Sequence, residues 1–253
     1  MPSFSTSAQF VVLLLLVVAA LGVDYDGVTQ ETLTISKLKD TVSSINVRGC
    51  TISTLEIEGD KSTFSGTLLI ETSTFRTLTL SNFKCEDCTI TIRDNTIGNT
   101  IDDMNSFTAL SIDAGEIIGG SAVVTIQSNT FTARLGPAAV GTAATAITVT
   151  TTGMVGSAIF SVTDNTAHVR GDTSATFFSV DTKFDDDVQL TIRQNMVMTE
   201  QDFFNTFDFS GSSFHGASAV EVADNWIFAT NPSAALDLVV PEAANLPQAM
   251  AQL

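Results

Sequence analysis

The side chains best suited to acid–base chemistry gather in one part of the chain. Asp185, Asp186 and Asp187 form its densest run of carboxylates, and His215 follows in the next stretch. Hydrolysis of a glycosidic bond needs two carboxylates, one of them held as an acid, whereas calcium prefers a dense set of oxygen ligands. Asp185, Asp186 and His215 are therefore the candidates for hydrolysis, and the three aspartates are the candidates for calcium.

The residues around these candidates favour a structural role. Only Lys183 and Arg193 supply positive charge near the aspartates, which is too little for a lyase base and a cationic groove. A run of aspartates is typical of a solvated turn, and an isolated histidine is typical of an ordinary turn residue. We assign no catalytic residue and no metal ligand, and expect no cofactor, with calcium binding by the three aspartates as the alternative.

Two further features are candidates for binding. Arg170, Gly171 and Asp172 form a tripeptide that integrin-type receptors read when it is displayed at a loop tip, although so short a match arises readily by chance. Trp226, the single tryptophan, is either a contact residue or a cover for the last turn of the fold, and we favour the cover. Binding therefore remains a hypothesis at both places.

Cysteine is sparse, with only Cys50, Cys85 and Cys88 in the chain. In an oxidising compartment Cys85 and Cys88 are close enough to form a disulfide, which leaves Cys50 unpaired and buried. A redox site of the C-x-x-C type would need a surrounding βαβ pattern, and zinc would need further ligands such as histidine nearby. The structural disulfide is the favoured interpretation.

The amino terminus is typical of an exported protein. Residues 1–22 carry no charged side chain, Phe10–Ala20 is almost entirely apolar, and small residues precede Val23 as at a cleavage site. We predict a signal peptide at 1–22, since the apolar run is too short to anchor in a bilayer. The mature chain is expected to be secreted or at the extracellular surface, without a transmembrane segment.

The charge of the chain limits the classes of molecule that it is expected to bind. With 28 acidic against 11 basic residues, the formal net charge is −17. A field of this sign repels nucleic acids and other polyanions, so we expect none of these as partners. An extracellular protein or glycan remains as the expected partner.

The strongest signal in the sequence is an internal repeat. The pattern Φ-x-Φ-x-x-N-x-Φ, with Φ apolar, occurs seven times around one position that we call the anchor. The anchors are Cys50, Ser73, Asn95, Asn129, Asn165, Asn195 and Asn225. Alternation at period two marks a strand with one buried face, and asparagine tolerates the left-handed backbone that a turn requires. The five asparagines are expected to stack as a ladder along the molecule.

A second apolar pair precedes each anchor by 15 to 17 residues, and one more apolar residue lies between the two strands. Three inward stations in each turn are what a three-faced coil needs, and stacked turns bury a continuous core. The sequence therefore predicts an all-β fold, a single-stranded right-handed parallel β-helix of about seven rungs. Its expected limits are 33–240, after a lead-in or cap at 23–32 and before a tail or capping helix at 241–253.

The length of the repeat varies at only one corner. Successive anchors lie 23, 22, 34, 36, 30 and 30 residues apart, and the additional residues all follow the anchor. They predict inserted loops at Gly98–Ala109, Thr132–Ala146, His168–Thr176 and Met198–Thr206. Loops at one corner of a solenoid lie side by side and often form a binding face, although insertions also accumulate wherever they do no harm.

With the repeat established, the chain resembles the right-handed parallel β-helix proteins of the pectin-lyase-like superfamily. Its rung texture resembles the dispersed gene family surface proteins of trypanosomatids, in TITIRDNTI, VVTIQSNTF, IFSVTDNTA, QLTIRQNMV and VEVADNWIF. The resemblance covers about residues 33–240 and implies a surface or secreted protein of adhesive type. Members of that family are much longer, which would make this chain a short relative or a fragment.

Polygalacturonases provide a test of the enzymatic alternative. The order of Asp185-Asp186 and then His215-Gly216 is similar to their Asp-Asp and Gly-His-Gly motifs, but Phe214 stands where the first glycine belongs. Their Asn-Thr-Asp and downstream Arg-x-Lys are missing as well. The sequence therefore favours a non-enzymatic extracellular β-helix that presents a loop face for binding or adhesion. A polysaccharide hydrolase or lyase and an inactive fragment of a larger surface protein are the alternatives.

Overall fold

The computed structural model describes residues 22–36, 42–101, 106–118, 121–136, 143–185, 187–200, 203–229 and 235–239. The expected signal peptide at 1–22 lies outside these ranges except for Gly22, and the expected tail at 241–253 and Asp186 lie outside them entirely. Every regular element in the described ranges is a strand. No helical segment that is long and apolar enough to traverse a bilayer occurs within these ranges.

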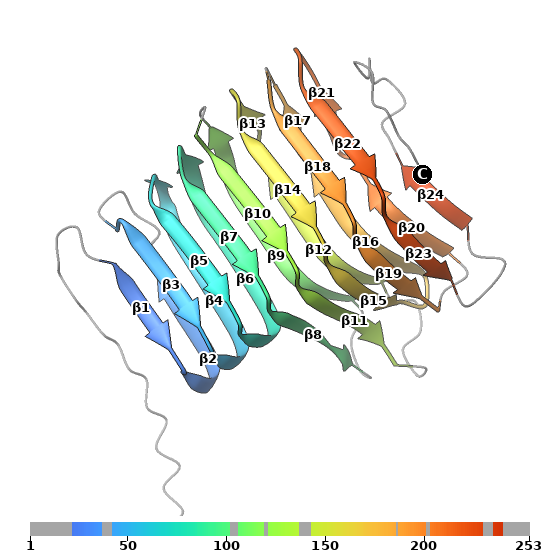
Figure 1. Cartoon of the computed structure of the whole chain (residues 1–253), viewed down its shortest axis with the longest axis horizontal. Coiled ribbons are helices and arrows are strands. Elements are labelled where there is room, and N and C mark those ends of the chain that lie inside the picture. Colours follow the sequence, from blue (N-terminus) through green and yellow to red (C-terminus); the bar gives the residue numbers. More distant parts are fainter. Residues whose placement is uncertain are drawn as a thin grey trace, which may run out of the picture.

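One side of the molecule is an eight-stranded sheet in which each strand is parallel to its neighbours (Figure 1). Its strands contain the alternating apolar residues of the repeat and are in register, so that Ile90 faces Val124 and Val124 faces Phe160. In spatial order they are β1 (Val23–Asp26), β3 (Ser44–Arg48), β5 (Thr67–Glu71), β7 (Thr89–Arg93), β10 (Val123–Gln127), β14 (Ile159–Thr163), β18 (Gln189–Arg193) and β22 (Ala219–Ala223).

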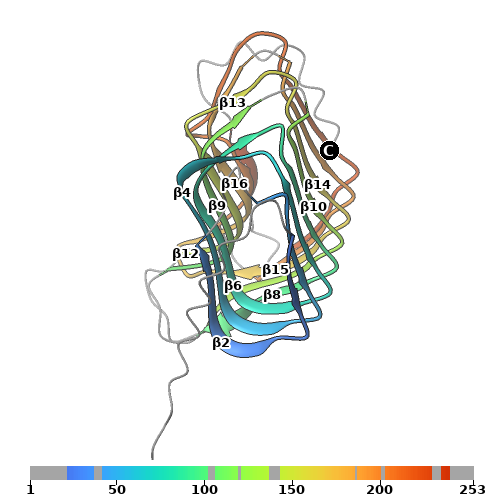
Figure 2. The same cartoon turned by 90° about the vertical axis from the view of Figure 1, so that its left-hand side faces the viewer.

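A sixteen-stranded sheet completes the coil, as the view in Figure 2 shows. It contains the second apolar pair of each rung. At the far corner it also contains the additional apolar residue that lies between the two strands of a rung. Its strands are β2 (Thr29–Ser36), β4 (Thr51–Phe64), β6 (Thr74–Glu86), β8 (Thr96–Ile101), β9 (Ser106–Ile118), β11 (Thr130–Leu135), β12 (Ala143–Thr151), β13 (Met154–Val155), β15 (Thr166–Arg170), β16 (Ser174–Asp181), β17 (Lys183–Phe184), β19 (Met196–Thr199), β20 (Phe203–Asp208), β21 (Ser213–Phe214), β23 (Trp226–Ala229) and β24 (Ala235–Val239). The predicted all-β parallel β-helix is thereby confirmed.

The core fills the inside of the coil with the residues that the repeat predicts. Side chains at the inward stations, such as Ile92, Leu80 and Phe184, are fully buried. The rings of Phe184 and Phe214 stack with centroids 4.7 Å apart, one rung above the other. Because each rung alone exposes both of its edges, burial depends on the neighbouring rungs.

The anchors form a hydrogen-bonded ladder inside one corner. The backbone N–H of each anchor from Cys50 to Asn195 donates to a side-chain oxygen of the next anchor, at 3.0 Å in all six cases. The amide nitrogen of each asparagine also donates to a carbonyl oxygen of the preceding rung, as Asn129 does to Ile92 at 2.9 Å. Buried backbone groups need such partners, and a stacked amide supplies an acceptor and a donor at every turn.

We expected the anchor to take the left-handed backbone of the corner. In the structure the residue before the anchor takes it instead. Positive φ angles of 50° to 59° occur at Gly49, Thr72, Asp94, Ser128, Asp164, Gln194 and Asp224. The anchor instead uses its side chain to bind the adjacent rungs. This division explains why the position before the anchor varies in residue type while the anchor is mostly asparagine: an exposed left-handed residue is tolerated in several types at a modest cost.

The regular pairing begins earlier than expected. Residues 23–32, expected as a lead-in, include β1, which pairs with β3 from Val23 to Asp26, and the start of β2, which pairs with β4 from Thr29 onward. Val28 takes the place of an anchor in this turn. The eight-stranded sheet thus contains one strand more than the seven repeats that the pattern identifies.

Both cysteine expectations match the structure. Cys85 and Cys88 form a disulfide, and their side chains are fully buried. Cys50 is a free, buried thiol whose Sγ lies 3.2 Å from the carbonyl oxygen of Arg48 and 3.5 Å from that of Tyr25. It occupies an anchor position, so its thiol takes the place of an anchor amide.

Candidate functional site

The corner expected to carry inserted loops consists largely of further strands. After each anchor from Asn95 onward the chain continues as β8, β11, β15, β19 or β23, which we call the lateral strands. They pair in parallel with one another, and the returning residues of β9, β12 and β16 pack behind β8, β11 and β15. Buried side chains come from both layers. They are Ala133, Leu135 and Val169 on the lateral strands and Phe107 and Phe177 on the returning chain. Packing on the returning chain makes β8, β11 and β15 part of a two-layer arrangement rather than loops.

Side chains alternate along the lateral strands, so one set faces solvent. We call this set the lateral face: Thr130, Thr132, Arg134, Thr166, His168, Arg170, Met196, Met198, Glu200, Trp226 and Phe228. The strand register aligns them in rows, because Thr132 pairs with His168, His168 with Met198, and Met198 with Phe228. Neighbouring strands lie about 4.8 Å apart, so these four residues cover roughly 14 Å.

Three basic side chains meet one carboxylate on the lateral face. Glu200 accepts from Arg134 Nη2 at 2.9 Å and from Arg170 Nη1 at 3.1 Å, and its Oε1 lies 3.1 Å from His168 Nε2. All four side chains are about 30% exposed. The Nε–H of Arg134 is buried without a hydrogen-bond partner in the described ranges. Two arginines against one carboxylate leave the cluster with positive charge in a strongly acidic chain.

The electrostatics of Glu200 reflect this environment. Burial acts to raise the pKa of its carboxyl group, but the charge of Arg134, the bond to His168 and the charge of Arg170 outweigh burial and lower it. The carboxylate is therefore held ionised and cannot serve as a proton donor near neutral pH. The cluster suits the orientation of a polar partner rather than acid catalysis.

Large apolar side chains stand beside this cluster. Trp226 is 59% exposed and Phe228 55%, both on the outward side of β23, and Met196 on the neighbouring strand is 37% exposed. A tryptophan that covered the last rung would lie over the core, so its exposure is at odds with the covering role that we favoured. Large exposed apolar side chains gathered in one area are typical of an interaction surface.

The Arg170-Gly171-Asp172 tripeptide lies where β15 leads into β16, but its arginine and glycine are not displayed as the integrin-type interpretation requires. Arg170 ends the strand β15, and its guanidinium is engaged by Glu200. Gly171 is enclosed, because a Cβ there would lie 1.9 Å from the carbonyl oxygen of Ser174. Asp172 is exposed and has a partner of its own. The structure therefore directs attention from the tripeptide to the cluster that contains Arg170.

Of the candidate acid–base residues, the structure places Asp185 and His215 one rung apart. Asp185 and His215 follow stacked strands, their backbone N–H groups donating to Met154 and Phe184 at 2.9 and 2.8 Å. The Asp185 carboxylate is paired with Lys183, while Asp187 and His215 are exposed. Within the described ranges no group of three or more His, Cys, Asp or Glu side chains is placed to hold a metal ion. Asp186 lies outside those ranges.

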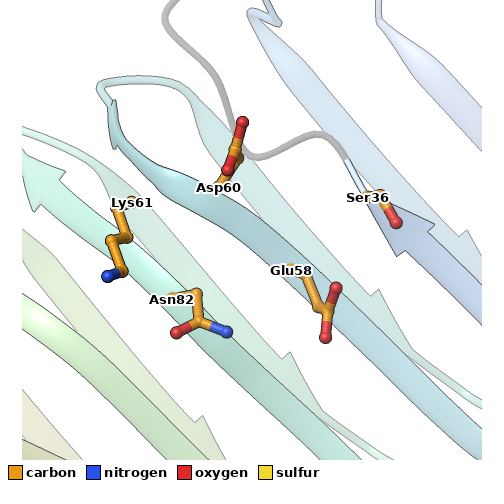
Figure 3. A pocket seen from close by; sticks show the side chains of 5 residues that line it. All are labelled: Ser36, Glu58, Asp60, Lys61 and Asn82. Atoms are coloured by element: carbon orange, nitrogen blue, oxygen red, sulfur yellow. The ribbon is translucent and has the colours of Figure 1, made fainter.

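A shallow depression of about 370 Å³ lies on another side of the coil, where β4 and β6 pair irregularly. Ser36, Glu58, Asp60, Lys61 and Asn82 line it. Figure 3 shows these side chains spread along separate strands rather than pointing to one centre. Apart from the half-buried Glu58 they are exposed, so the depression offers no dry environment for chemistry.

Sequence reasoning missed Arg134 and Glu200, although the repeat contains the signal that identifies them. Arg134, Arg170 and Glu200 each lie five residues after an anchor, and His168 lies three after one. Residues at equal offsets from stacked anchors share a face, so offsets of three and five would have placed all four together. The prediction of a loop after the anchor hides this signal, because loop residues at equal offsets need not share a face.

Comparison with known proteins provides no relative. Neither protein-family models, nor curated proteins, nor solved structures give a match to this chain.

Proposed function

We propose that this chain is an extracellular, non-enzymatic binding protein whose recognition surface is the lateral face. The observation that supports this most directly is the exposure of Trp226 and Phe228 on β23, beside Met196 and the Glu200 cluster. Parallel pairing of β23 with β19 holds the backbone of these side chains in place, which lowers the ordering cost of binding. Buried aromatic anchors surrounded by polar groups dominate the energy of most protein interfaces.

The composition of the lateral face favours a protein partner. Trp, Phe, Met and Arg are enriched at protein interfaces, and methionine adapts its shape to a partner surface. The two arginines would attract acidic groups of the partner over short distances, while the overall charge of −17 repels polyanions at long range. A glycan stacked on Trp226 is the alternative outcome that the experiment below distinguishes.

The extracellular setting and the ancestry are part of the same proposal. They rest on the uncharged apolar segment before Val23 and on the rung texture, which resembles pectin-lyase-like β-helices and trypanosomatid dispersed gene family surface proteins. A surface or secreted relative of such proteins would be adhesive. A carbohydrate-active enzyme is not favoured, because the Asp185 carboxylate is paired with Lys183.

The proposal is tested with arrays of immobilised extracellular-matrix proteins (fibronectin, laminin and collagen) and of polysaccharides, with and without calcium. We expect the chain to be retained on at least one matrix protein, and Trp226→Ala with Phe228→Ala to weaken retention about tenfold or more. Ile159→Ser is the matched control, since Ile159 is 39% exposed on β14 of the other sheet. Urea unfolding checks that each variant is folded.

Each other outcome contradicts a defined part of the proposal. Retention on polysaccharides alone would replace the protein partner by a glycan. Release of reducing ends would show an enzyme and return attention to Asp185 and His215. No retention on either array, or equal losses in the control and the double variant, would remove the lateral face as a recognition surface.

A further inference from the structure

The anchor ladder ends with an open position at Asn225. Every earlier anchor from Cys50 donates its backbone N–H to the next anchor's side chain, whereas the N–H of Asn225 has no such acceptor in the described ranges. The Asn225 amide also differs: its second N–H turns back to the carbonyl oxygen of Ala223 at 3.0 Å. In Asn195 the corresponding N–H donates to the next asparagine at 2.9 Å.

The strands beside Asn225 are edges of the sheets that the described residues form. Among the described strands, β22 has only β18 as a neighbour and β23 has only β19. Their inward residues Val220 and Ile227 remain half-buried, while the equivalent Leu190 and Val197 one rung earlier are fully buried. An edge with unpaired backbone groups and partly exposed core residues is a template for another strand.

The ladder specifies which strand would fit. An incoming parallel strand continues the core with alternating apolar residues and must place a side-chain oxygen opposite the N–H of Asn225. Asparagine supplies this acceptor, and its own amide N–H reaches a carbonyl oxygen of the preceding rung, as Asn225 reaches Ile192 at 3.0 Å. We propose that the edge formed by β22, Asn225 and β23 binds a parallel strand of another β-helical chain, with asparagine at its anchor.

The amino-terminal edge of a second copy does not meet these requirements. Val28 stands at the anchor position of its first rung and has no side-chain acceptor. In the register of the sheet, Asp24 of that copy would face Glu221, and like charges directly opposite destabilise a strand pair. The partner is therefore a different β-helix whose first complete rung carries the Φ-x-Φ-x-x-N-x-Φ pattern.

The single tryptophan makes the edge directly observable, because Trp226 lies on β23 and is 59% exposed. The probe is a synthetic peptide with the sequence of residues 189–199, QLTIRQNMVMT, titrated into the full-length chain. The matched peptide replaces its asparagine by alanine. We expect a blue shift of the Trp226 emission with the first peptide, and binding about tenfold weaker with the second.

A variant of the chain provides an independent test. The N–H of Trp226 donates to Asn195, so the N–H of Ile227 points to the open edge. Ile227→Pro removes this donor at an edge position where proline is tolerated, and we expect it to abolish peptide binding. Because Ile227 is half-buried, urea unfolding checks that the variant is still folded. Unchanged emission up to millimolar peptide, equal affinities of the two peptides, or normal binding by the variant would each overturn the inference.

Discussion

The backbone N–H of Asn95 donates to Oδ1 of Asn129 at 3.0 Å, across 34 residues of sequence. The same oxygen accepts from Nδ2 of Asn95, also at 3.0 Å. Both side chains are buried, with 2% and 1% of their surface exposed. An amide oxygen with two donors in a buried corner satisfies groups that would otherwise oppose folding.

Asn129→Ala should therefore destabilise the fold strongly. It leaves the buried N–H and amide of Asn95 without their acceptor and removes the bond to Ile92. An unpaired buried donor costs about 1–3 kcal/mol, so we expect a loss of about 2–4 kcal/mol in the free energy of unfolding, measured with urea. Asn99→Ala is the control, because Asn99 is exposed and, among the described residues, accepts from Thr100 alone. Similar losses in both variants would show that the ladder contributes little.

The repeat was predictable from sequence because the order of apolar and polar residues determines its strand register. Pairs such as Ile90 with Ile92 recur at a fixed distance from the anchor, and period-two burial permits only one orientation of a strand. Stacking then follows, since no single rung has a core of its own. The asparagine ladder and the buried Cys50 followed from the same register.

The corner conformation and the Glu200 cluster were not predictable in the same way. The left-handed position is occupied by residues as different as Thr72, Asp94 and Gln194, so composition did not mark it. The lateral strands vary in length, and Arg134 meets Glu200 across two strand spacings only because the side chain of arginine is long. Contacts of this kind depend on the length of polar side chains, and the pattern of apolar residues gives no information about it.

Thr72 is the most strained of the left-handed corner residues. Its φ is 50°, and it is β-branched, which makes a left-handed backbone costly by about 1–2 kcal/mol. Thr72→Gly should therefore raise the free energy of unfolding by about 1 kcal/mol, measured with urea. Thr74→Gly is the comparison, because Thr74 is an exposed strand residue without a positive φ, and there glycine should destabilise. A loss in both variants would contradict strain at Thr72.

The pKa of Glu200 predicts a dependence of stability on acid. Because its folded pKa is lowered from the usual 4.5, the ionised carboxylate stabilises the folded state above that value. This contribution is lost as the pH falls below 4.5 and through the lower folded pKa. Glu200→Gln should thus be less stable than the natural chain at pH 7, and the difference should shrink as the pH falls below 4.5.

Thermal or urea unfolding at a series of pH values measures this difference. Glu58→Gln is the control, since Glu58 lies in the depression on another side and outside the Glu200 cluster. A gap between natural chain and Glu200→Gln that stays constant with pH would show that the ion pairs with Arg134 and Arg170 contribute nothing measurable, as many exposed pairs do.

Cys50 offers a way to lengthen the ladder by one rung. Its thiol already lies 3.5 Å from the carbonyl oxygen of Tyr25, the acceptor that corresponds to Ile70 for the amide of Asn95. Cys50→Asn should donate to Tyr25 and accept from the N–H of Val28, and we expect a gain of about 1 kcal/mol in urea unfolding. Cys50→Val, which fills the position without polar atoms, should give no gain. If the asparagine variant were the less stable of the two, the corner would be too tight for an amide beside Val28.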